Sequence, residues 1–381
     1  MSHLAYLTNR SYVFEDYTWS HSPLPYALYD FALRPTRIPL NAFIAGPSAG
    51  GPMPDHSPRA VSTEYWDAVC GDAEDVVVVS SRDARTDTEG SEMMRWWVEK
   101  LEEDEYRNAR CLSVDSTDKD VFDRFLFGDK RMLSLWPSLS TSPILTGFAW
   151  SDLVISAIYR NFPLLRSYPS SPNTNSKALT SSPSSSSSSS SSISDPSHRT
   201  PNLPGVLAIH LRRGDYIRHC PNLDSWNAIY MGWAQFPTLP SSDRFDPFVF
   251  PSGSPERRAY YMEHCLPTIE QTVQRLHVIR EEHAATVGRE MRRVYVMTNE
   301  WAGSVWLEGL RDKLREDGWE DVMGSAGLVL DREQRYVSGA VDMGIAERAE
   351  VFVGNGFSSM SANIVMLRMA NGLDPLTNRF L

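Results

Sequence analysis

Short, wholly apolar segments alternate with longer amphipathic ones in the second half of the chain. Residues 206–211 (VLAIHL), 294–297 (VYVM) and 351–353 (VFV) lack polar alternation, which is typical of strands buried on both faces of a parallel sheet. The alternation of strands with helices predicts an α/β fold with a doubly wound sheet, whose ligands bind outside the carboxyl ends of the strands at a topological switch point. Helices are predicted over residues 257–285, 302–317, 336–349 and 358–370.

One proline interrupts the first of these predicted helices. Pro267 lies inside residues 257–285, where it marks either a first helical turn or a kink.

The first part of the chain carries weaker signals of the same kind. Residues 75–80 (DVVVVS) predict a buried strand, residues 92–108 an amphipathic helix and residues 152–159 a second, short helix. Residues 46–54 (GPSAGGPMP) are predicted to be a loop, because glycine and proline dominate them.

A low-complexity segment separates the two parts. Ser, Pro, Asn and Thr dominate it, and serine is unbroken over residues 184–192. Such a segment lacks the apolar surface that would offset its ordering entropy, so we predict a disordered Ser/Pro-rich linker over residues 167–203. This linker divides the chain into an N-terminal half, residues 1–166, and a C-terminal half, residues 204–381.

Composition and charge narrow the class of protein. With 381 residues, 41% hydrophobic and 22% charged, the chain has the length of about two globular domains. The net charge of -11 provides no general field for nucleic acid. No window approaches the roughly 18 to 20 apolar residues of a membrane helix. Residues 1–14 (MSHLAYLTNRSYVF) lack the order of basic, apolar and small residues that is typical of a signal peptide.

The four cysteines leave two alternatives open. Cys70, Cys111, Cys220 and Cys265 form no C-x-x-C pair, so a structural zinc is not expected. They are either buried thiols or one or two disulfides of a secretory protein.

The strongest candidate site follows the strand at residues 206–211. Because side chains alternate along a strand, His210 and Arg212 should point to one face, and Leu211 and Arg213 to the other. The forked donors of Arg212 suit a diphosphate oxygen and would stabilise a leaving group that gains negative charge. The alternative is a structural ion pair between Arg212 and Asp215, with His210 as a core residue.

A second strand-turn-helix junction covers residues 351–361 (VFVGNGFSSMS). Gly354 and Gly356 permit close backbone approach, and Ser358 and Ser359 can bind an anion at the start of the next helix or simply cap that helix. Two turns suited to anions in one half favour a nucleotide diphosphate.

Asp342 lies on the preceding helix among apolar neighbours, while Glu347 and Arg348 are predicted on its solvated side. A carboxylate there can accept the paired N–H donors of guanine or the hydroxyl groups of a ribose. The alternative is a surface Asp beside a basic partner. Residues 118–120 (Asp-Lys-Asp) lie in a polar run, so we predict that they are solvated and that no metal is required.

Together these motifs resemble the O-fucosyltransferase family of GT-B glycosyltransferases. Residues 210–215 match the family's H-L-R-R-x-D stretch, and Asp342 with residues 352–359 matches its D…(F/V)-x-G-N-x-x-S-S stretch. Residues 4–19, 38–51 and 370–372 are similar to fungal members of the family.

The resemblance implies two Rossmann-like halves facing a cleft, with the donor GDP-fucose bound mostly by the C-terminal half. It implies metal-independent, inverting transfer of fucose to a hydroxyl group of a protein or glycan acceptor. The catalytic residues would be Arg212, which contacts the β-phosphate, and Asp215, which orients the arginine turn. The donor would also contact residues of both motifs, namely His210, Asp342, Gly354, Asn355, Ser358 and Ser359.

The resemblance also bears on the N-terminus. Members carry a Gly/Asn-rich loop between the first strand and the first helix, whereas residues 1–5 (MSHLA) resemble the middle of that helix. We therefore expect the N-terminal half to be incomplete at its start. Two alternatives stay open: the chain is a fragment, from which an upstream membrane anchor could also be missing, or the protein lacks part of its active site. The family implies the lumen of the endoplasmic reticulum or Golgi, where Cys220 and Cys265 would form a disulfide across the loop after the arginine motif.

Two other functions stay open on the sequence. A pseudoenzyme would bind the GDP-sugar without turnover, and a transferase for another nucleotide sugar would keep the phosphate contacts while changing those to the base and sugar.

Overall fold

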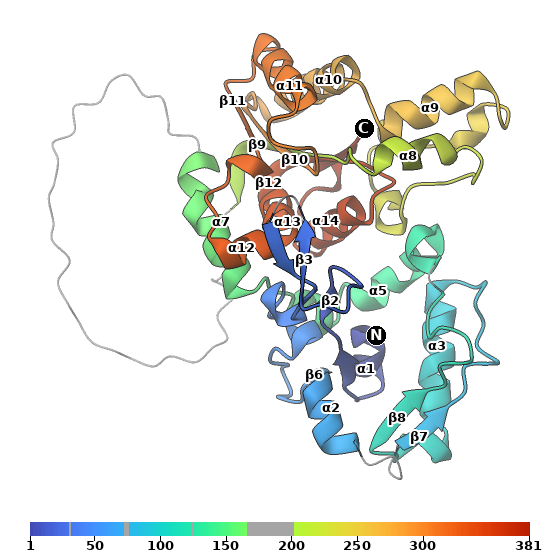
Figure 1. The fold of residues 1–381 in the computed structure, drawn as a ribbon. Helices are drawn as coiled ribbons and strands as arrows, with labels where there is room; N and C mark the ends of the chain where they lie inside the picture. Colours follow the sequence, from blue (N-terminus) through green and yellow to red (C-terminus); the bar gives the residue numbers. More distant parts are fainter. Residues whose placement is uncertain (30–31, 72–75, 124, 166–201) are drawn as a thin grey trace, which may run out of the picture.

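The core of the protein is one five-stranded parallel sheet built by the second half of the chain (Figure 1). The computed structural model describes residues 1–29, 32–71, 76–123, 125–165 and 202–381. The sheet order is β11-β10-β9-β12-β13, and every adjacent pair is parallel. The strands are β9 (Leu203–Leu211), β10 (Arg293–Thr298), β11 (Asp321–Gly324), β12 (Ala349–Gly354) and β13 (Asn378–Phe380).

Helices cover both faces of this sheet. α10 (Ile269–Val287) and α11 (Val305–Glu316) pack on one face, where Val294 and Val296 belong to their core. α13 (Ser338–Arg348) and α14 (Ser359–Ala370) pack on the other, against Tyr295 and Phe352. Figure 1 shows the first pair of helices above the sheet and the second pair below it.

This arrangement places the topological switch point between β9 and β12. The connections that leave β9 and β10 cross one face, and those that leave β11 and β12 cross the other. The chain therefore leaves the neighbouring carboxyl ends of β9 and β12 toward opposite faces of the sheet. This leaves an open edge where backbone N–H groups and side chains can face a ligand.

Two predicted helices are each divided in the structure. The predicted helix 257–285 forms α9 (Pro255–Cys265) and α10, because Pro267 ends the first and Thr268 caps the second in a capping box with Gln271. The predicted helix 336–349 forms α12 (Arg332–Tyr336) and α13.

The end of the chain also differs from the prediction. Residues 358–370 are not the closing element, since β13 follows them and adds an edge strand. β11 and β13, of four and three residues, are too short to leave a hydrophobic run.

In the first half, the described strands pair only in twos. β1 (Tyr12–Phe14) with β6 (Ala60–Ser62) and β7 (Val76–Val79) with β8 (Cys111–Val114) are parallel. Two further pairs are antiparallel: β2 (Tyr17–Thr18) with β5 (Arg37–Ile38), and β3 (Tyr26–Tyr29) with β4 (Ala32–Pro35).

Short helices complete the first half. They are α1 (Ser2–Leu7), α2 (Thr63–Cys70), α3 (Gly90–Leu101), α4 (Asp104–Arg107), α5 (Trp136–Leu139), α6 (Pro143–Thr146) and α7 (Asp152–Leu165). The predicted helix 92–108 is therefore interrupted after Leu101, where the acidic residues 102–105 oppose the negative end of the helix dipole.

The two halves share one hydrophobic core. Val154, Ala157 and Ile158 of α7 join the core between the sheet and α13. The Trp150 Nε1 atom donates a hydrogen bond of 2.6 Å to Glu347, whose side chain is buried, so the prediction that Glu347 faces solvent is wrong. The predicted boundaries at residues 166 and 204 stay predictions, and nearly all of the predicted linker lies outside the described residues.

Candidate functional site

The turn after β9 presents an arginine at the switch point. The Nε and Nη2 atoms of Arg212 donate hydrogen bonds to the carboxylate of Asp215, at 3.2 and 2.8 Å. The guanidinium also lies 4.8 Å from the ring centroid of Tyr216. The Arg212 side chain is 38% exposed, so a ligand can reach a group that the fold already holds in place.

The two faces of β9 are used as predicted. His210 lies on the face of α14, where its Nδ1 atom is 2.8 Å from Ser361 Oγ. Leu211 joins the core on the opposite face, and Arg213 stacks there on Trp306 of α11, 4.1 Å from the ring centroid. The prediction that Arg213 points away from His210 is confirmed.

Asn299 fixes the β9 turn from the neighbouring strand. Its Oδ1 atom accepts a hydrogen bond from the Arg213 N–H at 2.7 Å, and its Nδ2 atom donates one to Asp215 at 3.0 Å. Gly214 between them has φ +38°, a left-handed value that favours glycine. The sequence analysis missed Asn299, although its place directly after β10 could have marked it as part of the same sheet edge.

The charges in this turn stabilise one another. Burial alone would lower the pKa of Arg212, but the hydrogen bonds that Arg212 donates to Asp215, together with the charges of Tyr216, Asp215 and Tyr17, outweigh burial, so the net shift of this pKa is upward. Burial raises the pKa of Asp215, and its contacts with Arg212 and Asn299 reverse this to a net lowering. Burial, with a smaller effect of Arg212, lowers the pKa of His210 to about 4, so the imidazole is neutral at physiological pH.

The turn after β12 is held by its own hydrogen bonds. The Asn355 Nδ2 atom donates to the carbonyl of Cys265 at 2.7 Å, and its Oδ1 atom accepts from Phe357 N–H at 3.1 Å. Asn355 N–H donates to Ser361 Oγ, which also contacts His210. Asn355 thus orders the loop with both side-chain atoms, and Ser361 joins the two turns.

The two glycines of this turn are required by close packing. A Cβ atom on Gly356 would lie 2.3 to 2.5 Å from ring atoms of Tyr230, and one on Gly354 would lie 3.1 Å from Ser361 Cβ. The ring of Tyr230 therefore covers the turn, and only glycine fits beneath it.

Ser358 and Ser359 begin α14 in different ways. Ser358 is completely buried at the N-cap position, yet its hydroxyl makes no cap bond and has no hydrogen-bond partner. The interpretation of Ser358 as a simple side-chain cap is therefore wrong. Ser359 is exposed in the first helical turn. A buried hydroxyl without a partner at a helix N-terminus is suited to an anionic oxygen.

Asp342 is buried on α13 and holds two neutral donors. Its carboxylate accepts hydrogen bonds from the hydroxyl groups of Tyr295 and Ser325. Burial raises the pKa of Asp342 to about 6, and the two hydrogen bonds oppose this shift. The alternative of a surface Asp beside a basic partner is wrong, because the carboxylate is buried and its two contacts are hydroxyls.

The cysteines form two disulfides. Cys220 is bonded to Cys265, which clamps the loop after the arginine turn to the end of α9. Cys70 is bonded to Cys111, which joins α2 to β8. The alternative of four free thiols is therefore wrong.

Metal ligands do not gather in the part of the chain that the structure describes. No group of three or more His, Cys, Asp or Glu residues there is arranged to hold an ion. Asp118 accepts hydrogen bonds from Ser80 and Arg82, and its side chain is only 5% exposed, so the prediction that this residue is solvated is wrong. Among the described helices, none combines the length and the apolar character needed to cross a membrane.

A parallel sheet with two turns suited to anions at its switch point is typical of nucleotide-binding α/β proteins. The comparisons with known proteins identify the class further. The family profile of GDP-fucose protein O-fucosyltransferase matches residues 195–371, so the predicted resemblance to this family is confirmed. A comparison with curated proteins gave no match.

Two solved structures of another protein were aligned with this chain. The structure of POFUT1 in complex with GDP-fucose (crystal form II) aligns with a TM-score of 0.51 at 13% identity, covering 100% of this chain and 91% of that chain. The structure of POFUT1 in complex with GDP (high-resolution dataset) aligns with a TM-score of 0.48 at 12% identity, covering 100% and 92%. The first of these likenesses confirms the predicted GT-B fold class.

Proposed function

We propose that this chain transfers fucose from GDP-fucose to a hydroxyl group of a protein or glycan acceptor, with inversion at the anomeric carbon. The observation that carries the proposal is the Arg212 turn, which holds a partly exposed guanidinium at the switch point, within the residues that the O-fucosyltransferase profile matches. Guanidinium donors pair with phosphate oxygens in two-point contacts, so this position suits the diphosphate of the donor.

The two turns would bind the diphosphate from opposite sides. Arg212 exchanges part of its contact with Asp215 for the β-phosphate, and Asp215 with Asn299 keeps the turn in place. The free hydroxyl of Ser358, the exposed Ser359 and the first N–H groups of α14 provide neutral donors. Gly354 and Asn355 shape the β12 turn so that these donors can approach the ligand.

Two buried side chains would hold the nucleoside. His210 uses its Nδ1 atom for Ser361, which leaves Nε2 for the ligand. Asp342 would accept N–H groups of guanine or hydroxyls of ribose in place of the hydroxyls of Tyr295 and Ser325.

The chemistry then follows from where charge develops. The acceptor oxygen forms a bond to the anomeric carbon while the bond from that carbon to the phosphate oxygen breaks. The proton of the acceptor hydroxyl is released to water, so the products are the fucosylated acceptor, GDP and one proton. Negative charge accumulates on the departing GDP. Arg212 lies where it can stabilise this charge without moving, which is the main contribution we assign to this site. We assign no metal to this step.

The compartment is part of the same proposal. Two disulfides in one chain are typical of proteins that fold in an oxidising compartment, so we propose that the chain works in the secretory pathway.

The function is tested by incubating the purified chain with GDP-fucose and measuring released GDP and fucose. We expect GDP release that continues in the presence of a chelator and that UDP-sugars do not support. A protein that binds GDP-fucose in calorimetry but releases no GDP with any acceptor would be a pseudoenzyme, and one that does not bind GDP-fucose would contradict the proposal.

A further inference from the structure

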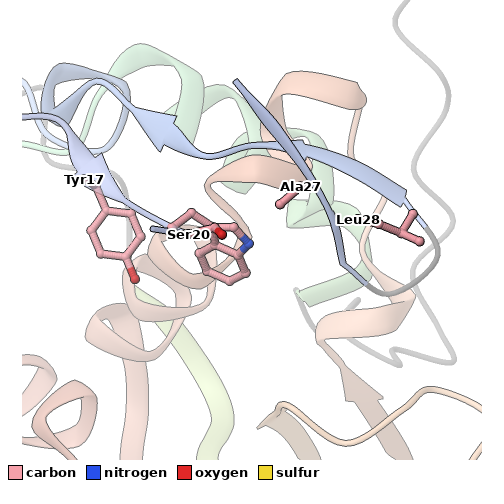
Figure 2. A pocket seen from close by; sticks show the side chains of 5 residues that line it. Tyr17, Ser20, Ala27 and Leu28 are labelled. Carbon is pink, nitrogen blue, oxygen red and sulfur yellow. The ribbon is translucent and has the colours of Figure 1, made fainter. Parts of the chain in front are cut away.

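A small pocket in the first half lies outside the motifs described so far. It has a volume of about 330 Å³ and is lined by Tyr17, Trp19, Ser20, Ala27 and Leu28. Figure 2 shows Tyr17 and Ser20 on one side of this pocket and Ala27 and Leu28, from the β3–β4 hairpin, on the other. Two aromatic rings, the hydroxyls of Tyr17 and Ser20, and the strand residues Ala27 and Leu28 therefore line one concave surface.

The aromatic wall of the pocket is held in place before any ligand binds. Tyr17 pairs with Ile38 between β2 and β5, and its ring lies 5.5 Å from that of Phe43 in an edge-to-face contact. Trp19 donates its backbone N–H to Thr36 at 2.8 Å, and the guanidinium of Arg34 lies 5.4 Å from its ring. A preformed wall costs a ligand little ordering entropy.

The pocket lies against the C-terminal half. Tyr17 is close enough to Arg212 for its phenol to contribute to the raised pKa of that arginine, after the larger effects of burial, Asp215 and Tyr216. Tyr26, at the start of the hairpin, acts on Arg332 of α12 in the same way. Tyr17 and Tyr26 thus lie within electrostatic range of two arginines of the C-terminal half, one of which, Arg212, would bind the β-phosphate.

The composition of the lining indicates the kind of ligand. One face of a pyranose ring carries only C–H groups and packs on aromatic rings, while its edge carries hydroxyls that need polar partners. Tyr17 and Trp19 provide the rings, and Ser20 with the Tyr17 hydroxyl provides polar partners. A volume near the lower limit of ligand pockets, about 300 Å³, suits one sugar ring rather than a nucleotide.

We propose that the pocket formed by Tyr17, Trp19, Ser20, Ala27 and Leu28 binds a single pyranose ring next to Arg212. The proposal rests on the proposed function, because a fucosyltransferase brings the fucosyl group of its donor to this edge and, where the acceptor is a glycan, also a sugar of the acceptor. Both have the same chemistry, and the experiment separates them.

The first test uses sugars without nucleotide, so it does not depend on GDP binding. Saturation-transfer NMR is recorded with methyl glycosides of fucose, galactose, glucose and N-acetylglucosamine, each mixed with the full chain. We expect transfer to ring C–H protons of at least one glycoside, its loss in Trp19→Ala and its partial retention in Trp19→Phe. Tyr65→Ala, which removes an exposed aromatic ring on α2, is the matched control and should keep the signal.

The second test compares GDP with GDP-fucose by calorimetry on the same variants, after thermal unfolding has confirmed that each is folded. If the pocket holds the fucosyl group, Trp19→Ala weakens GDP-fucose binding by about tenfold and leaves GDP binding unchanged. If it holds an acceptor sugar, both affinities stay at the wild-type value while the glycoside signal is lost.

The proposal is overturned if Trp19→Ala changes neither the saturation transfer nor the ratio of the GDP and GDP-fucose affinities. Failure of the proposed function looks different, because in that case the wild type binds neither GDP nor GDP-fucose, whatever the result with free glycosides.

Discussion

The turns after β9 and β12 lie side by side at one sheet edge, yet they are built in opposite ways. The β9 turn is charged and partly exposed, and its arginine is held by an ion pair and an aromatic ring. The β12 turn is uncharged and buried, and glycines under the ring of Tyr230 set its shape. The β9 turn thus presents a charged group that a ligand can contact, and the β12 turn presents a rigid surface that can position the ligand.

Because of this difference, we expect mutations in the two turns to have different effects, one on catalysis and the other on stability. Changes in the β9 turn should reduce catalysis while the fold survives, because its side chains face solvent. Changes in the β12 turn should reduce stability first, because its atoms are packed on every side. The predictions below test that division, from the largest effect to the smallest.

Removing the guanidinium of Arg212 should have the largest effect. Arg212→Ala is expected to lower kcat for fucose transfer by about 10²- to 10³-fold, because the departing GDP loses its main charge partner. The melting temperature should stay close to that of the wild type, since the Arg212 side chain is 38% exposed. Steady-state kinetics and thermal unfolding measure the two effects.

Arg218→Ala is the matched control, because Arg218 is an exposed arginine on α8 (Tyr216–His219), in the same loop. It should transfer fucose at the wild-type rate. Equal losses in the two arginine variants would mean that general positive charge, rather than the position of Arg212, is responsible.

A single methyl group in the β12 turn should destabilise the fold. Gly356→Ala places a Cβ atom 2.3 Å from the ring of Tyr230, and we expect a loss of roughly 2 to 3 kcal/mol in the free energy of unfolding from overpacking. Gly339→Ala on α13 is the control, because its Cβ has open space and should be neutral or slightly stabilising. Denaturant unfolding of both variants is the measurement.

The double variant Gly356→Ala with Tyr230→Leu sharpens this test, since a smaller side chain at residue 230 makes room for the methyl group. If the double variant is no more stable than the sum of its parts predicts, the two residues are not in the contact that the structure shows.

His210, which contacts Ser361 between the two turns, should make the stability of the fold depend on pH. The unfolded state protonates His210 near its usual pKa of 6.5, whereas the folded state does so only at about 4, so the folded protein binds fewer protons between these values and loses stability as the pH falls through them. Between pH 7 and pH 5 the contribution is about 2 kcal/mol. In His210→Asn, which keeps a polar partner for Ser361, that part of the decline should vanish.

Asp342 has the opposite effect on stability. Its raised pKa of about 6 makes the folded state bind more protons than the unfolded state, so its contribution to stability increases as the pH falls. Its effect is the same in both proteins, so the difference between wild type and His210→Asn isolates the histidine. Parallel stability curves from pH 7 to pH 5 would show that His210 is not buried in its neutral form.

The partner of the arginine should have the smallest effect. Asp215→Asn keeps the shape of the side chain but removes its charge, and we expect a loss in kcat of about tenfold, because Arg212 keeps its stacking on Tyr216 and loses only its orientation. Transfer kinetics on this variant measure it. A loss as large as that of Arg212→Ala would instead place Asp215 in contact with the reacting groups.

Some features of this site could be predicted from the sequence, and others could not. The faces of His210 and Arg213 followed from strand alternation, because β9 is long and buried. β13 could not be found from a three-residue segment, and Tyr230 could not be linked to Gly356 because the contact joins residues far apart in the chain. The approach of Tyr17 to Arg212 has the same cause, since tertiary packing across the two halves leaves no local pattern.

The central claim is that the switch-point edge binds GDP as part of a nucleotide sugar, and a thermal-shift comparison of GDP, UDP and ADP tests it most directly. We predict that GDP raises the melting temperature of the wild type more than UDP or ADP does, and that Arg212→Ala loses most of this shift. A larger shift with UDP, or equal shifts with all three nucleotides, would contradict the account.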